Sequence, residues 1–137
     1  MWTHKGKEFT SEMIGDYLGF VYLIVDTETN MKYIGKKLFK STRRLKPLKG
    51  KLRKRKKIVE SDWKDYFSSS ETIKSLVETS GENRFTREIL HLCRTKGAMS
   101  YLELLEQVHR NALLDNTYYN GIISCRINAT HLKELKT

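Results

Sequence analysis

The stretch FVYLIVDTETNMKYIG, residues 20–35, decides the fold. It begins with an apolar run rich in β-branched and aromatic residues over 20–25, passes through a polar turn cluster over 26–30, and ends with a second run over 31–35. Two such runs joined by a short turn predict a β-hairpin. One tyrosine stands in each run, so the hairpin brings two phenol groups onto adjacent strands.

Segments on both sides of the hairpin predict further elements. Upstream, residues 11–18 predict a short helix that ends at Gly19. Downstream, the sequence predicts a helix over 70–77 with serine N-cap candidates and Gly81 as its stop, and then a third strand over 85–93. An amphipathic helix is predicted over 98–114. A short apolar stretch follows over 122–127, and the polar tail from Ala129 predicts a frayed helix. The expected fold class is α+β, with a small three-stranded antiparallel sheet flanked by helices.

Length and composition indicate one folded unit. The 137 residues suit a single domain over 1–137, and 39% hydrophobic residues with a single proline are typical of a globular chain. No apolar run approaches the roughly 20 residues that cross a bilayer, and no signal-type stretch follows Met1. We therefore expect no membrane partner and a cytoplasmic location, in the host cell if the gene is carried by a phage.

Cysteine and histidine usage argues against a zinc site. Cys93 and Cys125 lie far apart in the sequence, which fits neither a disulfide scaffold nor a CxxC pair, and both are interpreted as ordinary thiols. The four histidines show no metal-ligand spacing.

The net charge of +10 points to a polyanionic partner. Between residues 36 and 57 every charged residue is basic, which accounts for half of the 26 Lys and Arg residues. We interpret 36–57 as a basic loop that binds nucleic acid through phosphates; the alternative is a solvated loop or a localisation tag. The nucleic-acid-binding candidates are Lys37, Lys40, Arg44, Lys51, Arg53, Lys54, Arg55, Lys56 and Lys57.

Two triplets across the hairpin, Phe20-Val21-Tyr22 and Tyr33-Ile34-Gly35, resemble the paired signature of the GIY-YIG nucleases. The second triplet matches fully, whereas in the first Phe20 takes the place of the usual glycine and Gly19 directly precedes it. Further matches follow in chain order: Lys36, Arg43, Glu106 and Tyr119-Asn120-Gly121. The resemblance covers about residues 19–121, and within the family it is strongest to phage-encoded, homing-endonuclease-like proteins.

The resemblance implies a magnesium-dependent DNA endonuclease that hydrolyses phosphodiester bonds, of a phage homing type or a DNA-degrading or nicking type. Tyr22 would act as general base or orient the water, with Tyr33 helping to hold it. Because a free tyrosine has a pKa of about 10, a base role needs a nearby cation or metal. We expect Lys36 and Arg43 to supply that positive field.

Glu106 would be the sole protein carboxylate on Mg²⁺, a cation that keeps several waters and for which Mn²⁺ could substitute. Glu103, one turn earlier, is the alternative ligand. Arg43 would clamp the scissile phosphate, with Arg44 as the runner-up. No small-molecule cofactor is expected.

Three positions have supporting or open roles. Asn120 would orient the hairpin or Glu106, and Gly35 marks a close approach of the backbone. Many family members carry a His or Tyr after the arginine, where this chain has Pro47. Tyr66 is a candidate for that role.

The sequence also allows other interpretations of these residues. Each tyrosine could be a packing residue and Glu106 a solvent-facing helix residue. The chain could then be a non-catalytic nucleic-acid-binding module, or a protein-interaction factor that uses its amphipathic helix. If it is a nuclease, cutting both strands requires a homodimer or sequential nicking.

Overall fold

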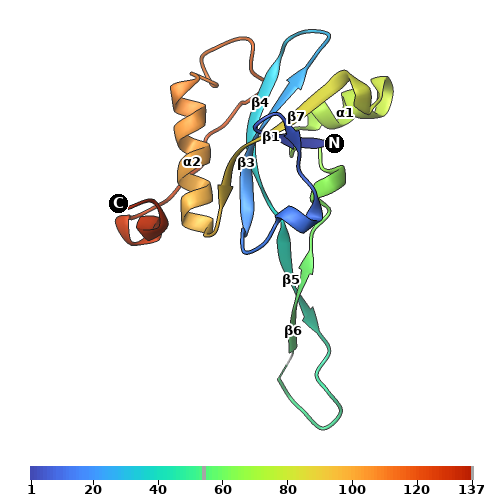
Figure 1. Ribbon diagram of the computed structural model, residues 1–137, viewed down its shortest axis with the longest axis vertical. Coiled ribbons are helices and arrows are strands. Elements are labelled where there is room, and N and C mark those ends of the chain that lie inside the picture. The colour runs from blue at the N-terminus through green and yellow to red at the C-terminus, as the bar shows by residue number, and fades with distance from the viewer. Residues whose placement is uncertain (54, 137) are drawn as a thin grey trace.

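The computed structural model describes residues 1–53 and 55–136. A five-stranded sheet in the order β2-β1-β7-β3-β4 forms the centre, and a separate two-stranded sheet pairs β5 with β6 (Figure 1). The strands are β1 (Trp2–His4), β2 (Lys7–Glu8), β3 (Gly19–Asp26), β4 (Lys32–Leu38), β5 (Lys40–Leu45), β6 (Arg55–Glu60) and β7 (Phe85–Cys93). The helices are α1 (Glu71–Ser80) and α2 (Lys96–His109), with the short 3-10 segments η1 (Ser11–Met13), η2 (Trp63–Asp65), η3 (Glu82–Arg84) and η4 (Ala129–Leu135).

The predicted hairpin is confirmed as the antiparallel pair β3–β4, in register from Gly19 opposite Leu38 to Val25 opposite Lys32. The predicted third strand is confirmed as β7, which pairs antiparallel with the other edge of β3. β3 is therefore the central strand of the antiparallel part of the sheet. Its apolar run fits that place because residues on both faces of a central strand are buried.

The sheet has five strands rather than three, because the first residues of the chain add β1 and β2. β1 pairs parallel with β7, and the Trp2 indole donates to the carbonyl of Trp63 at 2.7 Å. Strands of two and three residues carry too little alternation to be recognised in a sequence. The helix predicted over 11–18 is also wrong, since only the single 3-10 turn η1 forms there.

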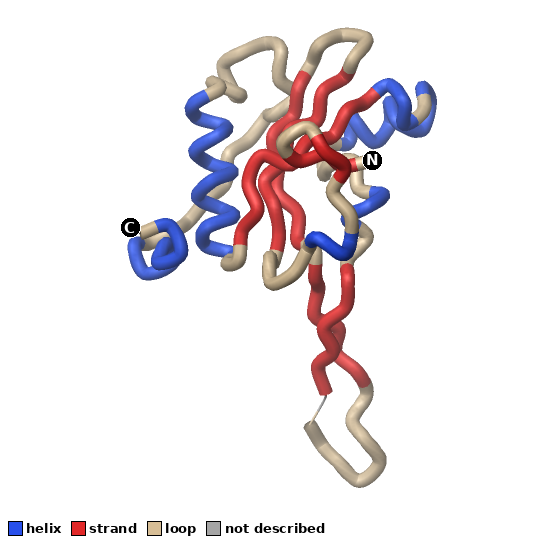
Figure 2. Tube along the Cα trace, viewed as in Figure 1, coloured by secondary structure: helices blue, strands red, loops and turns tan. Residues whose placement is uncertain are grey.

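The two faces of the sheet bury separate apolar clusters, as expected when successive side chains of a strand alternate. On one face, Phe20, Tyr22 and Ile24 join an aromatic cluster that includes Trp2 and Trp63. On the other face, the main contacts come from α2, which runs along one side of the sheet in Figure 2. Tyr22 and α2 consequently lie on opposite faces.

Capping residues define where the helices begin. Ser70 accepts from the Ile73 amide at 3.4 Å and starts α1, and Gly81, with φ of +84°, follows its last residue, as predicted. α2 starts after Thr95 and stops at His109, five residues before the predicted end. Asn111 adopts a left-handed φ of 52°, which is incompatible with a continued helix. Residues 122–127 form no strand, and the tail from Ala129 forms 3-10 turns.

The basic segment is an antiparallel ribbon rather than a loop. β5 and β6 pair from Lys40 opposite Glu60 to Leu45 opposite Arg55, and the ribbon projects away from the body (Figure 1). Near its base, three β-branched residues take part in cross-strand pairs: Val59 opposite Ser41, and Thr42 opposite Ile58. The sequence concealed this ribbon because the run of charges interrupts the apolar alternation that marks a strand.

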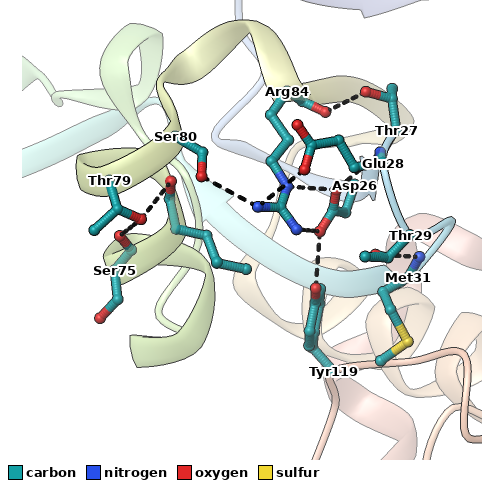
Figure 3. A network of polar contacts seen from close by, with 11 residues as sticks. Asp26, Thr27, Glu28, Thr29, Met31, Ser75, Thr79, Ser80, Arg84 and Tyr119 are labelled. Atoms are coloured by element: carbon teal, nitrogen blue, oxygen red, sulfur yellow. Dashed lines mark hydrogen bonds and ion pairs between the residues drawn. The ribbon is translucent and has the colours of Figure 1, made fainter.

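A buried carboxylate fixes the turn end of the hairpin (Figure 3). Asp26 is fully buried and accepts from Arg84 Nε at 2.7 Å and Nη2 at 2.8 Å, and from the Tyr119 hydroxyl at 2.9 Å. The Arg84 guanidinium holds the pKa of Asp26 far below its usual range. The network ties β3 and η3 to the segment that carries Asn120.

Both cysteines are free thiols, and burial raises the pKa of Cys93 to about 12. A buried thiol with so high a pKa is a packing residue rather than a nucleophile. Within the part of the chain that the structure describes, no helix has the length and apolar character that a membrane crossing requires.

Candidate active site

Three tyrosines gather on the sheet face opposite α2, and we call them the tyrosine cluster: Tyr22 of β3, Tyr33 of β4 and Tyr66, which follows η2. The rings of Tyr22 and Tyr33 are stacked with their centres 6.3 Å apart, and Tyr66 meets Tyr22 edge-on at 6.0 Å. The Tyr33 hydroxyl lies 3.1 Å from Ser69 Oγ. The predicted pair of tyrosines thus shares one face, and Tyr66, the candidate for the unassigned role, joins them.

Gly35 lies directly across from Tyr22 in the β3–β4 pairing. A Cβ atom at this position would be 2.2 Å from the Tyr22 hydroxyl oxygen, a distance that no real contact allows. The absent side chain lets the Tyr22 phenol lie over the β4 backbone. A glycine is therefore required here for space rather than for an unusual φ.

Burial favours the protonated form of two members of the tyrosine cluster, Tyr22 and Tyr66. Burial raises the pKa of Tyr22 well above its usual range and also raises that of Tyr66. Lys36 lies on the opposite face of β4 and Arg43 lies in the ribbon, so neither side chain is on the face of the tyrosine cluster. The nearby cation is instead Lys37, with Nζ 4.2 Å from the centre of the Tyr66 ring and 2.7 Å from Asp62.

Lys36 lies on the α2 face of β4. Its Nζ donates to Ser100 Oγ at 2.8 Å and lies 3.8 Å from the Glu103 carboxylate. Burial raises the pKa of Glu103, and Lys36 lowers it by a smaller amount. The charge of Glu103 also contributes to the raised pKa of Tyr22, so the two groups interact electrostatically past Gly35.

Glu106, the ligand predicted from the sequence, already has a side-chain partner on each of its carboxylate oxygens. Its Oε1 lies 2.8 Å from His91 Nε2, and its Oε2 accepts from Arg110 Nε at 2.8 Å. Burial acts to raise the pKa of Glu106, but the hydrogen bonds from Arg110 and His91 lower it below the usual value overall. Of the two carboxylates, Glu103 therefore has the weaker contacts with neighbouring side chains.

Asn120 holds the outer edge of β4. Its Oδ1 accepts from the Ile34 amide at 3.0 Å, and its Nδ2 donates to the Ile34 carbonyl at 2.8 Å. Gln107 of α2 donates to the same carbonyl at 3.4 Å. Of the two roles predicted for Asn120, the structure shows contact with the hairpin; no hydrogen bond to Glu106 is present among the residues it describes.

Arg43 and Arg44 lie in the ribbon, exposed, and opposite Lys57 and Lys56. In residues 1–53 and 55–136, neither arginine forms a hydrogen bond or an ion pair with the tyrosine cluster. The separation arises because the chain leaves the sheet at Phe39. The predicted phosphate clamp next to Tyr22 is thus not assembled by these two arginines.

The other predicted nucleic-acid contacts divide between the ribbon and its base. Lys37 pairs with Asp62, and Lys40 donates to the Gly15 carbonyl at 2.9 Å. Five more are exposed along β6 or the connection to it: Lys51, Arg53, Arg55, Lys56 and Lys57. Lys54 lies outside the described residues.

Sequence reasoning missed the contacts of Ser100 and Gln107, and it named Lys37 only as a nucleic-acid-binding candidate. Gln107 follows Glu103 by one helical turn, so the two share a helix face. That spacing was visible in the sequence, whereas the contacts of Lys37 and Ser100 depend on tertiary structure. The described chain contains no cluster of three or more His, Cys, Asp or Glu residues placed to hold a metal ion.

The fold and site define a nuclease family. A family model described as "Putative endonuclease segE, GIY-YIG domain" matches residues 2–123, most of the chain. The chain belongs to the GIY-YIG nuclease family, which confirms the resemblance found in its two triplets. No curated protein and no solved structure matches the chain.

Proposed function

We propose that this protein is a Mg²⁺-dependent DNA endonuclease that hydrolyses phosphodiester bonds. One observation carries the proposal: the tyrosine cluster and the Lys36–Glu103 pair lie on either side of Gly35, at the outer edge of β4, in a member of a nuclease family. Side chains from both faces of the sheet reach this edge. Residues 117–120 cover this edge at Lys32 and Ile34, so a phosphodiester backbone would approach it beside Gly35 and Lys36.

Glu103, rather than Glu106, is the carboxylate that fits a metal ion. Its one ionic contact is long, at 3.8 Å, whereas each oxygen of Glu106 has a partner at 2.8 Å. A half-buried carboxylate with a raised pKa gains most from a nearby divalent cation. Mg²⁺, for which Mn²⁺ could substitute, suits a single carboxylate because it keeps several waters.

The bound ion would supply charge to offset the negative charge that develops on the phosphate. The residues of the chain supply positions and protons around it. The Tyr22 hydroxyl, protonated at neutral pH, can donate a hydrogen bond to a phosphate oxygen or orient the attacking water. Lys36 and Lys37, on opposite faces of β4, add positive charge on both sides of the edge.

The proposal is tested by incubating purified protein with supercoiled plasmid and with phage genomic DNA in Mg²⁺, beside Glu103→Gln and an EDTA control. We expect nicked or linear DNA from the wild type with Mg²⁺ alone. Genomic DNA is included because strict site specificity would leave a plasmid uncut. Equal cutting by wild type and Glu103→Gln, or no cutting of either substrate, would contradict the proposal.

A second candidate is a non-catalytic nucleic-acid-binding module. The specific observation in its favour is that Tyr22 is buried with a raised pKa, as a packing residue would be. Salt-dependent DNA binding without any cleavage in Mg²⁺ or Mn²⁺ would favour this candidate. The nuclease is the better supported of the two because Gly35 leaves room for the Tyr22 hydroxyl over the β4 backbone.

Two further features belong to the same proposal. The protein would act on DNA in the cytoplasm, of the host cell if a phage encodes it, in a homing or DNA-degrading role. Cutting both strands would require a homodimer or two successive nicks. Cleavage kinetics separate these routes, since sequential nicking accumulates open-circular plasmid before linear plasmid.

A further inference from the structure

The β5–β6 ribbon places like positive charges opposite each other across its two strands. Two pairs of like charges lie directly opposite each other, Arg43 with Lys57 and Arg44 with Lys56. Like charges opposite each other destabilise a sheet, and a hairpin of two strands is only marginally stable by itself. In the described part of the chain, no carboxylate pairs with residues 41–53 or 55–59. A polyanion would relieve this repulsion.

The base of the ribbon, in contrast, is firmly attached to the body. The Glu60 carboxylate accepts from Ser11 Oγ and from the Trp63 indole, both at 2.7 Å. Ser61 donates from its amide to the Phe39 carbonyl at 2.7 Å and from its hydroxyl to the Leu38 carbonyl at 2.6 Å. A ribbon held in this way projects in a fixed direction from β4.

The two faces of the ribbon differ in composition. Alternation along the strands places Thr42, Arg44, Lys56 and Ile58 on the first face, and all four are exposed, Ile58 to 71%. The second face carries Ser41, Arg43, Leu45, Arg55, Lys57 and Val59, and its two apolar residues are half-buried. The first face therefore presents one exposed isoleucine beside two basic side chains, which offers an apolar contact next to hydrogen-bond donors.

We propose that the ribbon enters the major groove of duplex DNA and reads bases with its first face; this inference rests on DNA being the partner in the proposed function. The major groove is wide enough for a two-stranded ribbon. There, the Arg44 guanidinium can donate two hydrogen bonds to a guanine, and Ile58 can contact a thymine methyl group. Arg43 and Lys57, on the opposite face, contact phosphates.

The attachment of the ribbon also sets where DNA is read relative to where it is cut. Only Phe39 separates β5 from β4, and Arg44 is nine residues beyond Gly35. Nine extended residues span at most about 30 Å, which corresponds to about nine base pairs of B-DNA. The ribbon therefore recognises a sequence up to about nine base pairs from the scissile bond.

Two double variants with the same loss of charge separate the faces. Arg44→Gln/Lys56→Gln alters the first face, and Arg43→Gln/Lys57→Gln alters the second. A random duplex library is first selected with the wild-type protein in EDTA, so that the readout is binding alone. We expect the first variant to lose sequence preference. We expect the second to keep the preference and to bind with a salt dependence reduced by about two units of slope.

Modified bases test the groove and the isoleucine contact. In the selected site, methylation of guanine N7, which lies in the major groove, should abolish preferential binding by the wild type. Replacing the contacted thymine with deoxyuridine removes one methyl group and should weaken binding about fourfold. The same replacement should have no effect on Ile58→Ala, because the partner of the methyl group is already absent.

Three outcomes would overturn the inference: equal loss of preference in both double variants, indifference to guanine N7 methylation, or equally tight binding of single-stranded nucleic acid. Circular dichroism shows whether each variant keeps its fold. Failure of the proposed function would look different, since selective binding with no cleavage in Mg²⁺ leaves the inference standing. Cleavage without selective binding by the ribbon would support the proposed function and overturn the inference.

Discussion

Two glutamates one turn apart on α2 offer a matched test of the site. Glu103→Gln and Glu106→Gln each remove one negative charge and preserve shape. Glu103 lies beside Lys36 near the edge of β4, whereas Glu106 joins His91 and Arg110. We expect the first change to abolish cleavage with the fold intact, and the second to weaken the fold and leave cleavage in place.

For Glu103, the expected loss of cleavage is at least about 100-fold, the size typical of removing one group that stabilises the transition state. The stability of Glu103→Gln, in contrast to its activity, should increase at pH 7. Burial raises the pKa of Glu103 above its ordinary 4.5, so the ionised form is less favourable in the folded protein than in the unfolded chain. The stabilisation from protonated Glu103 is full below pH 4.5 and lost as pH rises through the raised value. Glu103→Gln should therefore melt higher than the wild type at pH 7, and the difference should vanish below pH 4.5.

For Glu106, the cost follows from two contacts of 2.8 Å made by side chains that are between a fifth and a third exposed. Solvent screening reduces such pairs to about 1 kcal/mol in total. For 137 residues the unfolding entropy is about 0.29 kcal/mol/K, so Tm should fall by about 3.5 °C. The cleavage rate of Glu106→Gln at 25 °C should stay within about threefold of the wild-type rate. This change is much smaller than the loss of about 100-fold expected for a group that contacts the reacting phosphate.

The measurements are plasmid nicking in Mg²⁺ at 25 °C, thermal melting at pH 7 and pH 4, and DNA binding in EDTA for both variants. Binding in EDTA should be close to that of the wild type for both, because Glu103 acts through the metal and the partners of Glu106 lie within the protein. If Glu106→Gln loses cleavage and Glu103→Gln keeps it, the choice of carboxylate is wrong. If both lose cleavage equally without a change in Tm, the partners of Glu106 do not determine its role.

Three further changes probe the hairpin and its anchor. Tyr22→Phe should lower cleavage at least tenfold and leave DNA affinity within about twofold, because one hydroxyl contributes little to a contact with many phosphates; equal losses in both assays would argue against a chemical role. Gly35→Ala should cost about 2 kcal/mol in urea unfolding, since its Cβ would clash with both the hydroxyl oxygen and the ring carbon Cζ of Tyr22. Tyr22→Phe removes only the oxygen, so combining the two changes should recover part of that loss; no recovery would mean that the contact with the ring carbon dominates. Asp26→Asn should cost about 3 kcal/mol at pH 7 by leaving Arg84 without its charged partner. Because the pKa of Asp26 is lowered, this stabilisation is complete above 3.8 and declines as pH falls below it, so the two proteins should converge in acid-induced unfolding.

Local sequence signals were sufficient for the elements that form around local patterns. The β3–β4 hairpin, β7 and α1 were predicted because their apolar runs, turn residues and caps lie within each segment. β1 was not, since its partner β7 is more than 80 residues away and its three residues show no period. The ribbon was missed because β-branched pairs such as Thr42 and Ile58 are embedded among charges.

Local sequence patterns also predicted part of the site. The hairpin signature alone was enough to place Tyr22 and Tyr33 on one face. The choice between two glutamates one turn apart depends on His91, which comes from β7, and no local pattern predicts that contact. Arg43 was assigned from its order in the chain, but the departure of the chain from the sheet at Phe39 carries it into the ribbon.

The double hydrogen bond from Asn120 to Ile34 also has a consequence for how the protein behaves in solution. β4 is the outermost strand of the main sheet, and an uncovered edge there could accept a strand from another molecule. Residues 117–119 already cover this edge at Lys32 through two backbone hydrogen bonds. A side-chain amide that offers one acceptor and one donor imitates the backbone of a neighbouring strand, and it occupies the edge at the Tyr33-Ile34-Gly35 triplet. Asn120, which aligns the hairpin, thereby also blocks edge-to-edge association with another polypeptide at this triplet.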